Sequence, residues 1–543
     1  MKRLKKAGAL VLALLMTFVF AIPAMAAEVT PETTYSITIQ NENDGHTYQA
    51  YQIFAGDVSS DNAQGGNEEG PILSNITWGS GVNGDALLAA LKAANSGKYG
   101  NCTTAKDVAE ALGAENAASA DAEAFADVVA NNLSTVFTES TFSNNTYKIS
   151  GLAAGYYLVV DSDDLVDGEP PLQGSNDAYS EYIVQVLGNV QMAPKSDVPT
   201  AVKKVDDKND SNTEEDQENW QDSADYDIGD HVPFQITITL PDNLDAYETY
   251  MLNISDRLSN GLVYNENSTK ITIDGKQIET VAEGDAIEPH QEDAKHFIWW
   301  DFNNIKANVY GATNGSEIVI TYTATLTKDA VIGSKGNPNT MHVEFSNNPN
   351  GTGTGTTPVD TVVVFTYQTI VNKVRPANEG EERNQPLSGA KFTLEKFVAS
   401  DEGTETYKNV QGNWVEKTVV ENQEGTTFTF TGLDDGEYRL TETVTPTGYN
   451  TIDPIEFTIT ATHEATSDDP QLTALNGNVA TGEITFTSDT TDGSLTTDVV
   501  NVSGSTLPET GGMGTTVFYV VGGVIVAGVL VLLVAKRRMG RAE

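Results

Sequence analysis

The sequence predicts a mainly β protein built from tandem β-sandwich domains, the first of which contains a helical insertion. Short segments that alternate apolar and polar residues recur along most of the chain, with turn-forming residues between them, as in antiparallel strands buried on one face. An Ala-rich segment from about residue 85 to residue 137 breaks this pattern. There Leu87, Leu88 and Leu91 recur at helical spacing, which predicts helices between strands of the first domain.

The first 26 residues have the composition of a secretory signal peptide. Four basic residues precede an apolar stretch from Ala7 to Ile22, and Ala24-Met25-Ala26 provides a cleavage site of the A-x-A type. We therefore expect residues 1–26 to be removed, and we exclude them from the predicted fold.

The chain that remains is long enough for three domains of ordinary size. A short linker at residues 194–199 and a low-complexity Gly-Thr repeat at residues 351–357 mark the expected boundaries. The predicted domains are a β-rich N-terminal domain with the helical insertion at residues 27–196, a middle sandwich at residues 197–357 and a C-terminal sandwich at residues 358–504.

The chain is strongly acidic and contains a single cysteine. It has 77 Asp and Glu residues against 31 Lys and Arg residues, with a formal net charge of -46. A surface of this sign repels phosphate backbones, which excludes nucleic acid as a partner. Cys102 cannot form an intrachain disulfide, although disulfides are the usual staple of exposed extracellular domains, so another kind of staple is expected.

No arrangement typical of a metal, cofactor or catalytic site stands out in the sequence. The six histidines form no H-E-x-x-H motif, and no Ser/His/Asp set or phosphate-cradling loop is recognisable. The carboxylate-rich segment at residues 206–216 lacks EF-hand spacing and its glycine, which favours a solvated loop over a calcium site. We therefore expect no cofactor, no metal and no enzymatic turnover.

The C-terminal segment combines three features in a fixed order. A pentapeptide at residues 507–511 is followed by an apolar run at residues 517–535 and a basic tail at residues 536–543. The run has roughly the 20 residues needed to cross a bilayer core as a helix. Because the basic tail retains its end on the cytoplasmic side, everything before the pentapeptide is expected to lie outside the cell.

The pentapeptide Leu507-Pro508-Glu509-Thr510-Gly511 resembles the LPxTG sorting signal, which Gram-positive sortases cut between Thr and Gly. The proline favours an extended backbone that suits a protease groove. The glycine allows close approach to the Thr510 carbonyl. This resemblance implies that the mature chain ends at Thr510 and is attached to cell-wall peptidoglycan by a housekeeping sortase.

The C-terminal domain carries the motifs K-V, L-x-G-A-x-F-x-L and Y-x-L-x-E…P-x-G-Y, beginning at Lys373, Leu387 and Tyr438. In this order they resemble the collagen-adhesin (Cna) B-type domain, an Ig-like sandwich. The middle domain is similar to the sibling A-type domain. The chain as a whole resembles SpaA/FimA-type shaft subunits of Gram-positive pili, in which a lysine on the first strand is joined covalently to an asparagine on the last.

The resemblance places such an isopeptide bond in the C-terminal domain between Lys373 and Asn501, with Glu442 as the acid. A lysine in a dry core loses solvation, so its pKa falls and the neutral amine becomes a nucleophile. A buried carboxylic acid has a raised pKa and can polarise the asparagine carbonyl. Packing supplies the proximity, and ammonia leaves.

In the middle domain the same resemblance implies Asp256 as the acid and Asn347 as the acceptor. Asn347 follows Val343 and Phe345 on one strand face. The lysine is ambiguous, because Lys203 and Lys204 are adjacent and alternate faces. We favour Lys203. The first domain lacks a lysine in its opening strand, so no bond is expected there.

Lys195 ends the segment Val190-Gln-Met-Ala-Pro-Lys195, which partly resembles the pilin motif, with Ala193 where the family usually has an aromatic residue. The motif lysine attacks the Thr–sortase thioester of the next subunit. This implies a class C pilin sortase, head-to-tail joining of Thr510 to Lys195, minor and tip pilins as further partners, and a fibre. The alternative is a monomeric wall-anchored adhesin.

Overall fold

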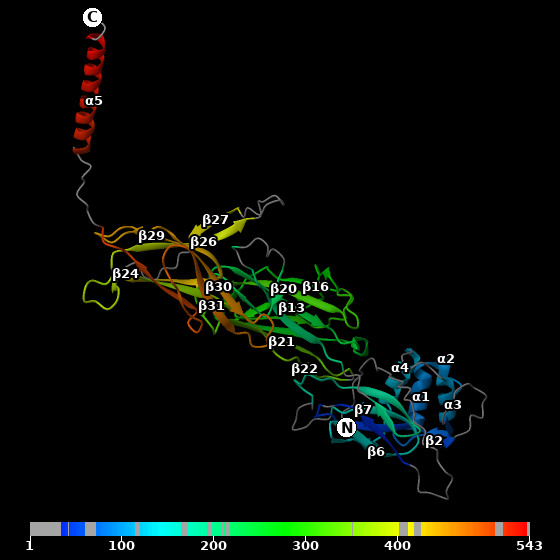
Figure 1. Cartoon of the computed structure of the whole chain (residues 1–543). Helices are drawn as coiled ribbons and strands as arrows, with labels where there is room; N and C mark the ends of the chain where they lie inside the picture. The colour runs from blue at the N-terminus through cyan, green and yellow to red at the C-terminus, as the bar shows by residue number, and fades with distance from the viewer. Residues whose placement is uncertain are drawn as a thin grey trace.

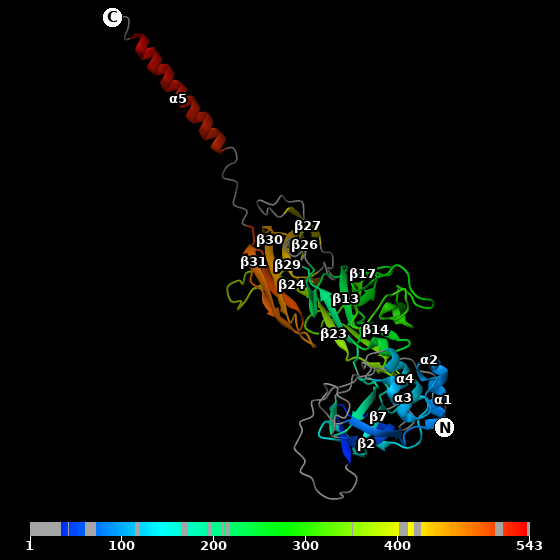
Figure 2. The same ribbon diagram turned by 90° about the vertical axis from the view of Figure 1, so that its right-hand side faces the viewer.

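The computed structural model describes most of the chain after the predicted signal peptide. The described residues are 34–41, 43–59, 72–113, 120–163, 172–192, 197–208, 211, 218–349, 351–400, 411–416, 425–504 and 514–539. Three pairs of β-sheets follow one another in a row, and we call them the first unit (residues 35–192), the second unit (200–365) and the third unit (367–500). Figures 1 and 2 show the first unit at one end of this row, with the C-terminal helix α5 projecting beyond the third unit.

The first unit has three layers. A four-stranded sheet has the order β5 (Thr141–Ser143), β6 (Thr146–Leu152), β1 (Tyr35–Ile39), β9 (Val190–Met192). The facing sheet has the order β3 (Ile72–Trp78), β2 (Tyr48–Ser59), β7 (Gly155–Asp161), β8 (Glu181–Val186), with β4 (Thr138–Glu139) beside β2. The helices are α1 (Gly84–Ala94), α2 (Ser96–Tyr99), α3 (Ala105–Leu112) and α4 (Ala120–Ala130).

The β2–β7–β8 sheet is buried on both faces because it has a different partner on each. Alternate residues such as Tyr48 and Val159 pack against the smaller sheet. The other face, including Phe54, packs against apolar residues of α1, α3 and α4 such as Leu87. Helix α3 begins with a capping box between Thr104 and Asp107, which fixes its N-terminus.

The second unit is a pair of seven-stranded sheets. One contains β11 (Trp220–Gln221), β10 (Thr200–Asp206), β13 (His231–Thr239), β20 (Glu317–Leu326), β16 (Lys270–Ile273), β17 (Lys276–Gln277) and β15 (Leu262–Tyr264). The other contains β12 (Ser223–Asp225), β23 (Asp360–Phe365), β21 (Asn337–Ser346), β14 (Leu252–Leu258), β19 (Phe297–Phe302), β18 (His290–Glu292) and β22 (Thr354–Thr356). Two 3₁₀ turns lie at Leu244–Ala246 and Asp293–Lys295. The strands alternate buried and less buried residues, and their inward faces form one apolar core.

The third unit is a pair of five-stranded sheets. One contains β25 (Gln385–Pro386), β24 (Tyr367–Arg375), β33 (Ser494–Val500), β32 (Thr487–Asp489) and β28 (Thr427–Leu433). The other has the order β27 (Gln411–Glu416), β26 (Lys391–Ser400), β29 (Gly436–Val444), β30 (Ile455–His463), β31 (Leu472–Thr481). The first and last long strands, β24 and β33, are parallel neighbours. The predicted mainly β fold, with paired sheets in tandem and helices inserted in the first unit, is confirmed.

The predicted signal peptide lies outside the described residues. Helix α5 (Gly514–Met539) includes the predicted membrane span at residues 517–535. In the described part of the chain, however, no helix meets the length and apolarity needed to cross a bilayer. The span therefore stays a prediction.

The buried His46, just before β2, connects the end of β7 with the segment before β8, and this segment also contacts the second unit. The His46 ring lies between two carboxylates, with Nδ1 2.6 Å from Asp161 Oδ2 and Nε2 2.9 Å from Asp177 Oδ2. Burial disfavours the charged ring, but hydrogen bonds to both carboxylates and their charges outweigh it and raise the pKa of His46 to about 9. The folded protein therefore holds an imidazolium at neutral pH.

Replacing this histidine should make stability depend on pH. Because the folded pKa lies above the ordinary 6.5, the contribution of His46 is fully present below pH 6.5 and is lost as the pH rises through about 9. We expect His46→Gln to lower the free energy of unfolding by about 3 kcal/mol below pH 6.5, and by much less above pH 9. Denaturant unfolding at both ends of this range measures the difference. A pH-independent loss, or an equal effect of His342→Gln on β21, would contradict the assignment.

Candidate functional site

Three predicted residues of the third unit meet in its core. Lys373 on β24 pairs in register with Val499 on β33, and Asn501 directly follows β33. Strand alternation turns Lys373 and Asn501 toward the facing sheet, where Glu442 lies on β29. Lys373 and Asn501 are fully buried, and Glu442 is nearly so.

The amine, the carboxamide and the carboxyl group of this site contact one another directly. Lys373 Nζ donates hydrogen bonds to Asn501 Oδ1 and, at 3.1 Å, to the Val499 carbonyl. Asn501 Nδ2 donates to Glu442 Oε1 at 2.9 Å and to Oε2 at 3.1 Å. Glu442 Oε1 lies 3.6 Å from Lys373 Nζ. One carboxyl group thus touches both the amine and the amide nitrogen.

The surroundings of Lys373 favour its neutral form. Burial lowers the pKa of its amine to about 8, although the opposite charge of Glu442 acts to raise it. The Phe392 ring lies 5.8 Å from Nζ, so one side of the amine faces an aromatic surface. About a tenth of this amine is therefore unprotonated at pH 7, far more than for an ordinary lysine, and the neutral form is the nucleophile.

In the second unit, the structure places Lys203 in the core and Lys204 near the surface. Lys203 Nζ lies 2.6 Å from Asp256 Oδ2 and 2.9 Å from the Tyr322 hydroxyl, and all three side chains are buried. Lys204 instead makes a part-exposed ion pair with Asp222. The two lysines point to opposite sides of β10 because successive side chains alternate along a strand.

Burial shifts the Lys203–Asp256 pair toward its neutral forms. It lowers the pKa of Lys203, against the attraction of Asp256, and it raises the pKa of Asp256, against the attraction of Lys203. The Tyr322 hydroxyl donates to Asp256 Oδ2 at 2.6 Å and accepts from Asn339 Nδ2 at 2.8 Å. Sequence reasoning missed Tyr322 and Asn339, and inward alternation on β20 and β21 was the available signal for them.

In the structure the predicted acceptor, Asn347, contacts the first unit and not Lys203. The Asn347 side-chain amide donates to the backbone carbonyls of Leu172 (2.9 Å) and Asp177 (3.3 Å) in the first unit. Asn339 precedes it by eight residues, roughly 26 Å along an extended chain. The two asparagines are an even number of residues apart, so alternation alone would place them on the same face. The pairing of β14 with β21 sets Asn339 opposite Leu258, diagonal to Asp256.

Two buried oxygens of this site have no hydrogen-bond partner among the described residues. They are Asp256 Oδ1 and Asn339 Oδ1. A buried acceptor without a donor costs free energy. A protonated Asp256 would carry an O–H donor on this face of the two neighbouring strands, where both unpaired oxygens lie. The raised pKa of Asp256 points the same way. The second unit thus holds an amine, an acid and an amide in one core, as the third unit does.

The remaining predicted residues lie outside the described part of the chain. They are Lys195 and the pentapeptide Leu507, Pro508, Glu509, Thr510 and Gly511. Cys102 is buried as a free thiol, and burial raises its pKa.

Three family models match successive parts of the chain. Residues 228–349 match the Cna-B-like domain of the Gram-positive pilin backbone subunit 2. Residues 372–471 match the SpaA prealbumin-like fold domain. Residues 500–539 match the LPXTG cell wall anchor motif.

A curated relative and two solved structures resemble longer stretches. The trypsin-resistant surface T6 protein of Streptococcus pyogenes serotype M6 is 25% identical over 446 residues, covering 72% of this chain and 76% of the relative. The structure of the T6 backbone pilin from that serotype has a TM-score of 0.48 at 17% identity and covers 88% of this chain and 100% of its own. The major pilin SpaD of Corynebacterium diphtheriae has a TM-score of 0.42 at 14% identity, with coverages of 88% and 100%.

The choice between Asn339 and Asn347 can be tested by peptide mapping. If Lys203 reacts with the amide that shares the Tyr322 hydroxyl with it, protease digestion should release a branched peptide that joins Lys203 to Asn339. We expect Asn339→Ala to abolish this peptide and Asn347→Ala to leave it intact, because Asn347 faces the first unit. A branched peptide that contains Asn347 would contradict the placement.

Proposed function

From the premise that the chain is an LPXTG-anchored backbone pilin of the Gram-positive type, exposed on the cell wall as part of a surface pilus, we propose that its second and third units each form an internal Lys–Asn isopeptide bond. The observation that carries this proposal is the buried Lys373 amine in contact with Asn501 and Glu442. The bonds make each subunit resistant to tension along the fibre.

In the third unit, the neutral Lys373 amine attacks Cγ of Asn501. The new C–N bond forms as the bond from Cγ to Asn501 Nδ2 breaks, and ammonia leaves. Glu442 lies within reach of both nitrogens, so it can accept the proton that the amine loses and deliver it to the departing one. Each bond forms only once in each chain, so the protein modifies itself and does not turn over a substrate.

In the second unit, Lys203 attacks Asn339 by the same chemistry, with Asp256 moving the proton. Asp256 contacts the amine directly, and Tyr322 connects Asp256 with the Asn339 amide through its hydroxyl group. Tyr322 therefore acts as a positioning residue. The aromatic rings of Phe234 and Tyr322, whose centroids lie 5.3 and 5.1 Å from Nζ, keep the amine in a dry environment.

The third-unit bond ties the first strand of that unit to the residue that follows its last strand. Lys373 and Asn501 are 128 residues apart in sequence but belong to parallel neighbours. By the loop-closure relation for disulfides, such a link restrains the unfolded chain by about 5 kcal/mol. A pull applied at the two ends of the unit then passes through a covalent bond, and the sheets cannot unzip.

The subunits are joined head to tail by a class C pilin sortase, which transfers Thr510 of one chain to Lys195 of the next. Such a heterologous contact does not close on itself, so it yields a fibre. A housekeeping sortase attaches the finished fibre to peptidoglycan, and minor and tip pilins complete it. This part of the proposal is supported by the sorting pentapeptide and the Lys195 segment of the sequence.

Intact-mass measurement tests the two bonds. The mature chain should weigh less than its sequence mass by two molecules of ammonia, because each bond releases one. Glu442→Ala should restore one ammonia and Asp256→Ala the other, whereas Glu437→Ala, at an exposed position of the same strand β29, should restore neither. A wild-type mass equal to the sequence mass would contradict the proposal. Circular dichroism establishes that each variant is folded.

Polymerisation can be tested separately on denaturing gels of cell-wall extracts. We expect a ladder of covalent oligomers from the wild-type chain, because the proposed Thr510–Lys195 linkage survives denaturation. Lys195→Ala should collapse the ladder to a single band, and the control Lys148→Ala, at an exposed lysine of β6, should preserve it. A single band from the wild-type chain would instead favour a monomeric wall-anchored adhesin.

A further inference from the structure

Buried carboxylates gather where the second unit meets the third. Asp225 is the last residue of β12, in the second unit, and only 3% of its surface is exposed. Asp434 and Asp435 form the turn between β28 and β29 of the third unit, where Asp434 is 1% exposed. Each of the three offers a carboxylate oxygen, and these oxygens lie within 4.8 Å of one another.

Asp225 has an oxygen that nothing in the described structure satisfies. Its Oδ2 is buried and makes no hydrogen bond to any described residue. The buried Tyr367 hydroxyl and the Asp434 carboxyl group both approach the Asp225 carboxylate, but neither forms a hydrogen bond of normal geometry with Oδ2, and the Tyr367 hydroxyl is likewise without a hydrogen-bond partner among the described atoms. An ionised oxygen in this position lacks compensation for its lost hydration.

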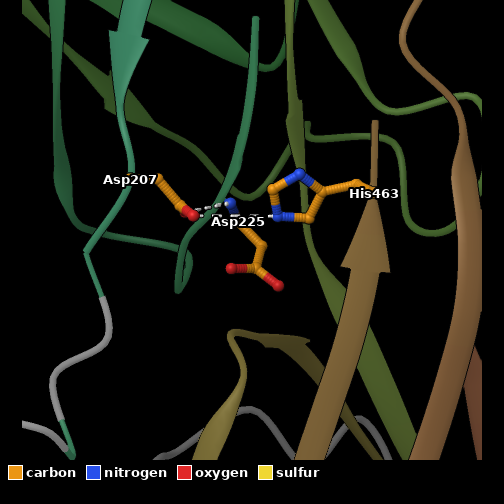
Figure 3. Close-up of side chains that lie close together, drawn as sticks. All are labelled: Asp207, Asp225 and His463. Atoms are coloured by element: carbon orange, nitrogen blue, oxygen red, sulfur yellow. Dashed lines mark hydrogen bonds and ion pairs between the residues drawn. The ribbon is translucent and has the colours of Figure 1, made fainter. Parts of the chain in front are cut away.

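The other neighbours of Asp225 are engaged elsewhere. Asp207 and His463 also have atoms within 4.8 Å of it, but Figure 3 shows the Asp225 carboxylate directed away from both. Asp207 accepts hydrogen bonds from the Asp225 backbone (3.3 Å) and from Gln221 (2.5 Å). His463 Nδ1 lies 2.7 Å from the Ser223 hydroxyl, and burial lowers the pKa of this histidine to about 4, so it brings no positive charge.

Lys396 is a cation that contacts this cluster in the described structure, and it does so through Asp434. Its Nζ lies 2.9 Å from both Asp227 Oδ2 and Asp434 Oδ2. A single positive charge therefore faces several carboxylates: Asp227 and Asp434, which it contacts, and the neighbouring Asp225 and Asp435. Burial raises the pKa of Asp225 and of Asp434 well above the ordinary range, which is the response expected when carboxylates outnumber cations.

We propose that Asp225, Asp434 and Asp435 bind a divalent cation of the calcium class at the junction of the second and third units. Calcium takes carboxylate oxygens in flexible geometry and completes its coordination with water. One ligand comes from the second unit and two come from the third, so the bound ion favours the docked arrangement of the two units. This site is independent of the proposed isopeptide bonds.

Calorimetric titration of the chelator-treated mature chain with calcium chloride tests the proposal. We expect saturable binding of one ion and a rise in the melting temperature of the wild-type chain. Asp225→Asn, which keeps the side-chain shape but removes the charge, should weaken binding by about a hundredfold, the equivalent of one lost charge-assisted contact of nearly 3 kcal/mol. The control Asp242→Asn, at an exposed carboxylate, should bind like the wild type.

The absence of binding heat and of a melting shift in the wild-type chain would overturn the proposal. So would equal binding by Asp225→Asn and the wild type. If Asp225→Asn fails to fold, Asp435→Asn replaces it, because Asp435 is only half-buried and its loss should weaken binding without disturbing the core. Magnesium chloride serves as the second titrant. A preference for magnesium over calcium would also contradict the assignment.

Discussion

The burial of a lysine amine inside a β-sandwich is the constraint on which both proposed isopeptide sites depend. Along β24, alternation turns Val371 and Lys373 toward the same core, and along β10 it does so for Lys203 and Val205. An amine in that environment is costly as a cation, so its pKa falls. The same packing holds an acid against the amine in both units, with an amide in direct contact in the third unit and one linked through Tyr322 in the second. The proposed reaction would therefore be driven by the folded sandwich itself, without an added catalyst.

Sequence alternation reveals which face of a strand a residue occupies, but it does not reveal how far along the strand its partner lies. Parity separates Lys203 from Lys204, because adjacent residues face opposite sides. It cannot separate Asn339 from Asn347, because eight residues preserve parity. The pairing register of β14 with β21 decides between them, and register depends on turn geometry and core shape across the whole sheet.

Strands, the helical insertion and the order of units were predictable because each rests on a local pattern. The clusters around His46 and Asp225 were not, since each joins segments separated by a hundred residues or more. Asp206 shows the same limit. The sequence around it favours a solvated loop, yet Asp206 is buried and accepts a hydrogen bond from the Asn219 backbone. Composition describes a segment's average environment, whereas a functional cluster depends on which individual residues the fold encloses.

Units in a fibre bear tension in series, so the proposed internal bonds would make the junctions between units the weakest points under load. At the first junction, Asn347 donates hydrogen bonds to backbone carbonyls of the first unit. At the second, Lys396 of the third unit contacts Asp227, and Asp434 backbone N–H donates to the same residue. These contacts are buried hydrogen bonds and ion pairs. Pulling the units apart would break them before water could hydrogen-bond to the exposed polar groups, which costs free energy. Asn347 thus links the first and second units by hydrogen bonds, and a cation bound by Asp225 would reinforce the second junction in the same way.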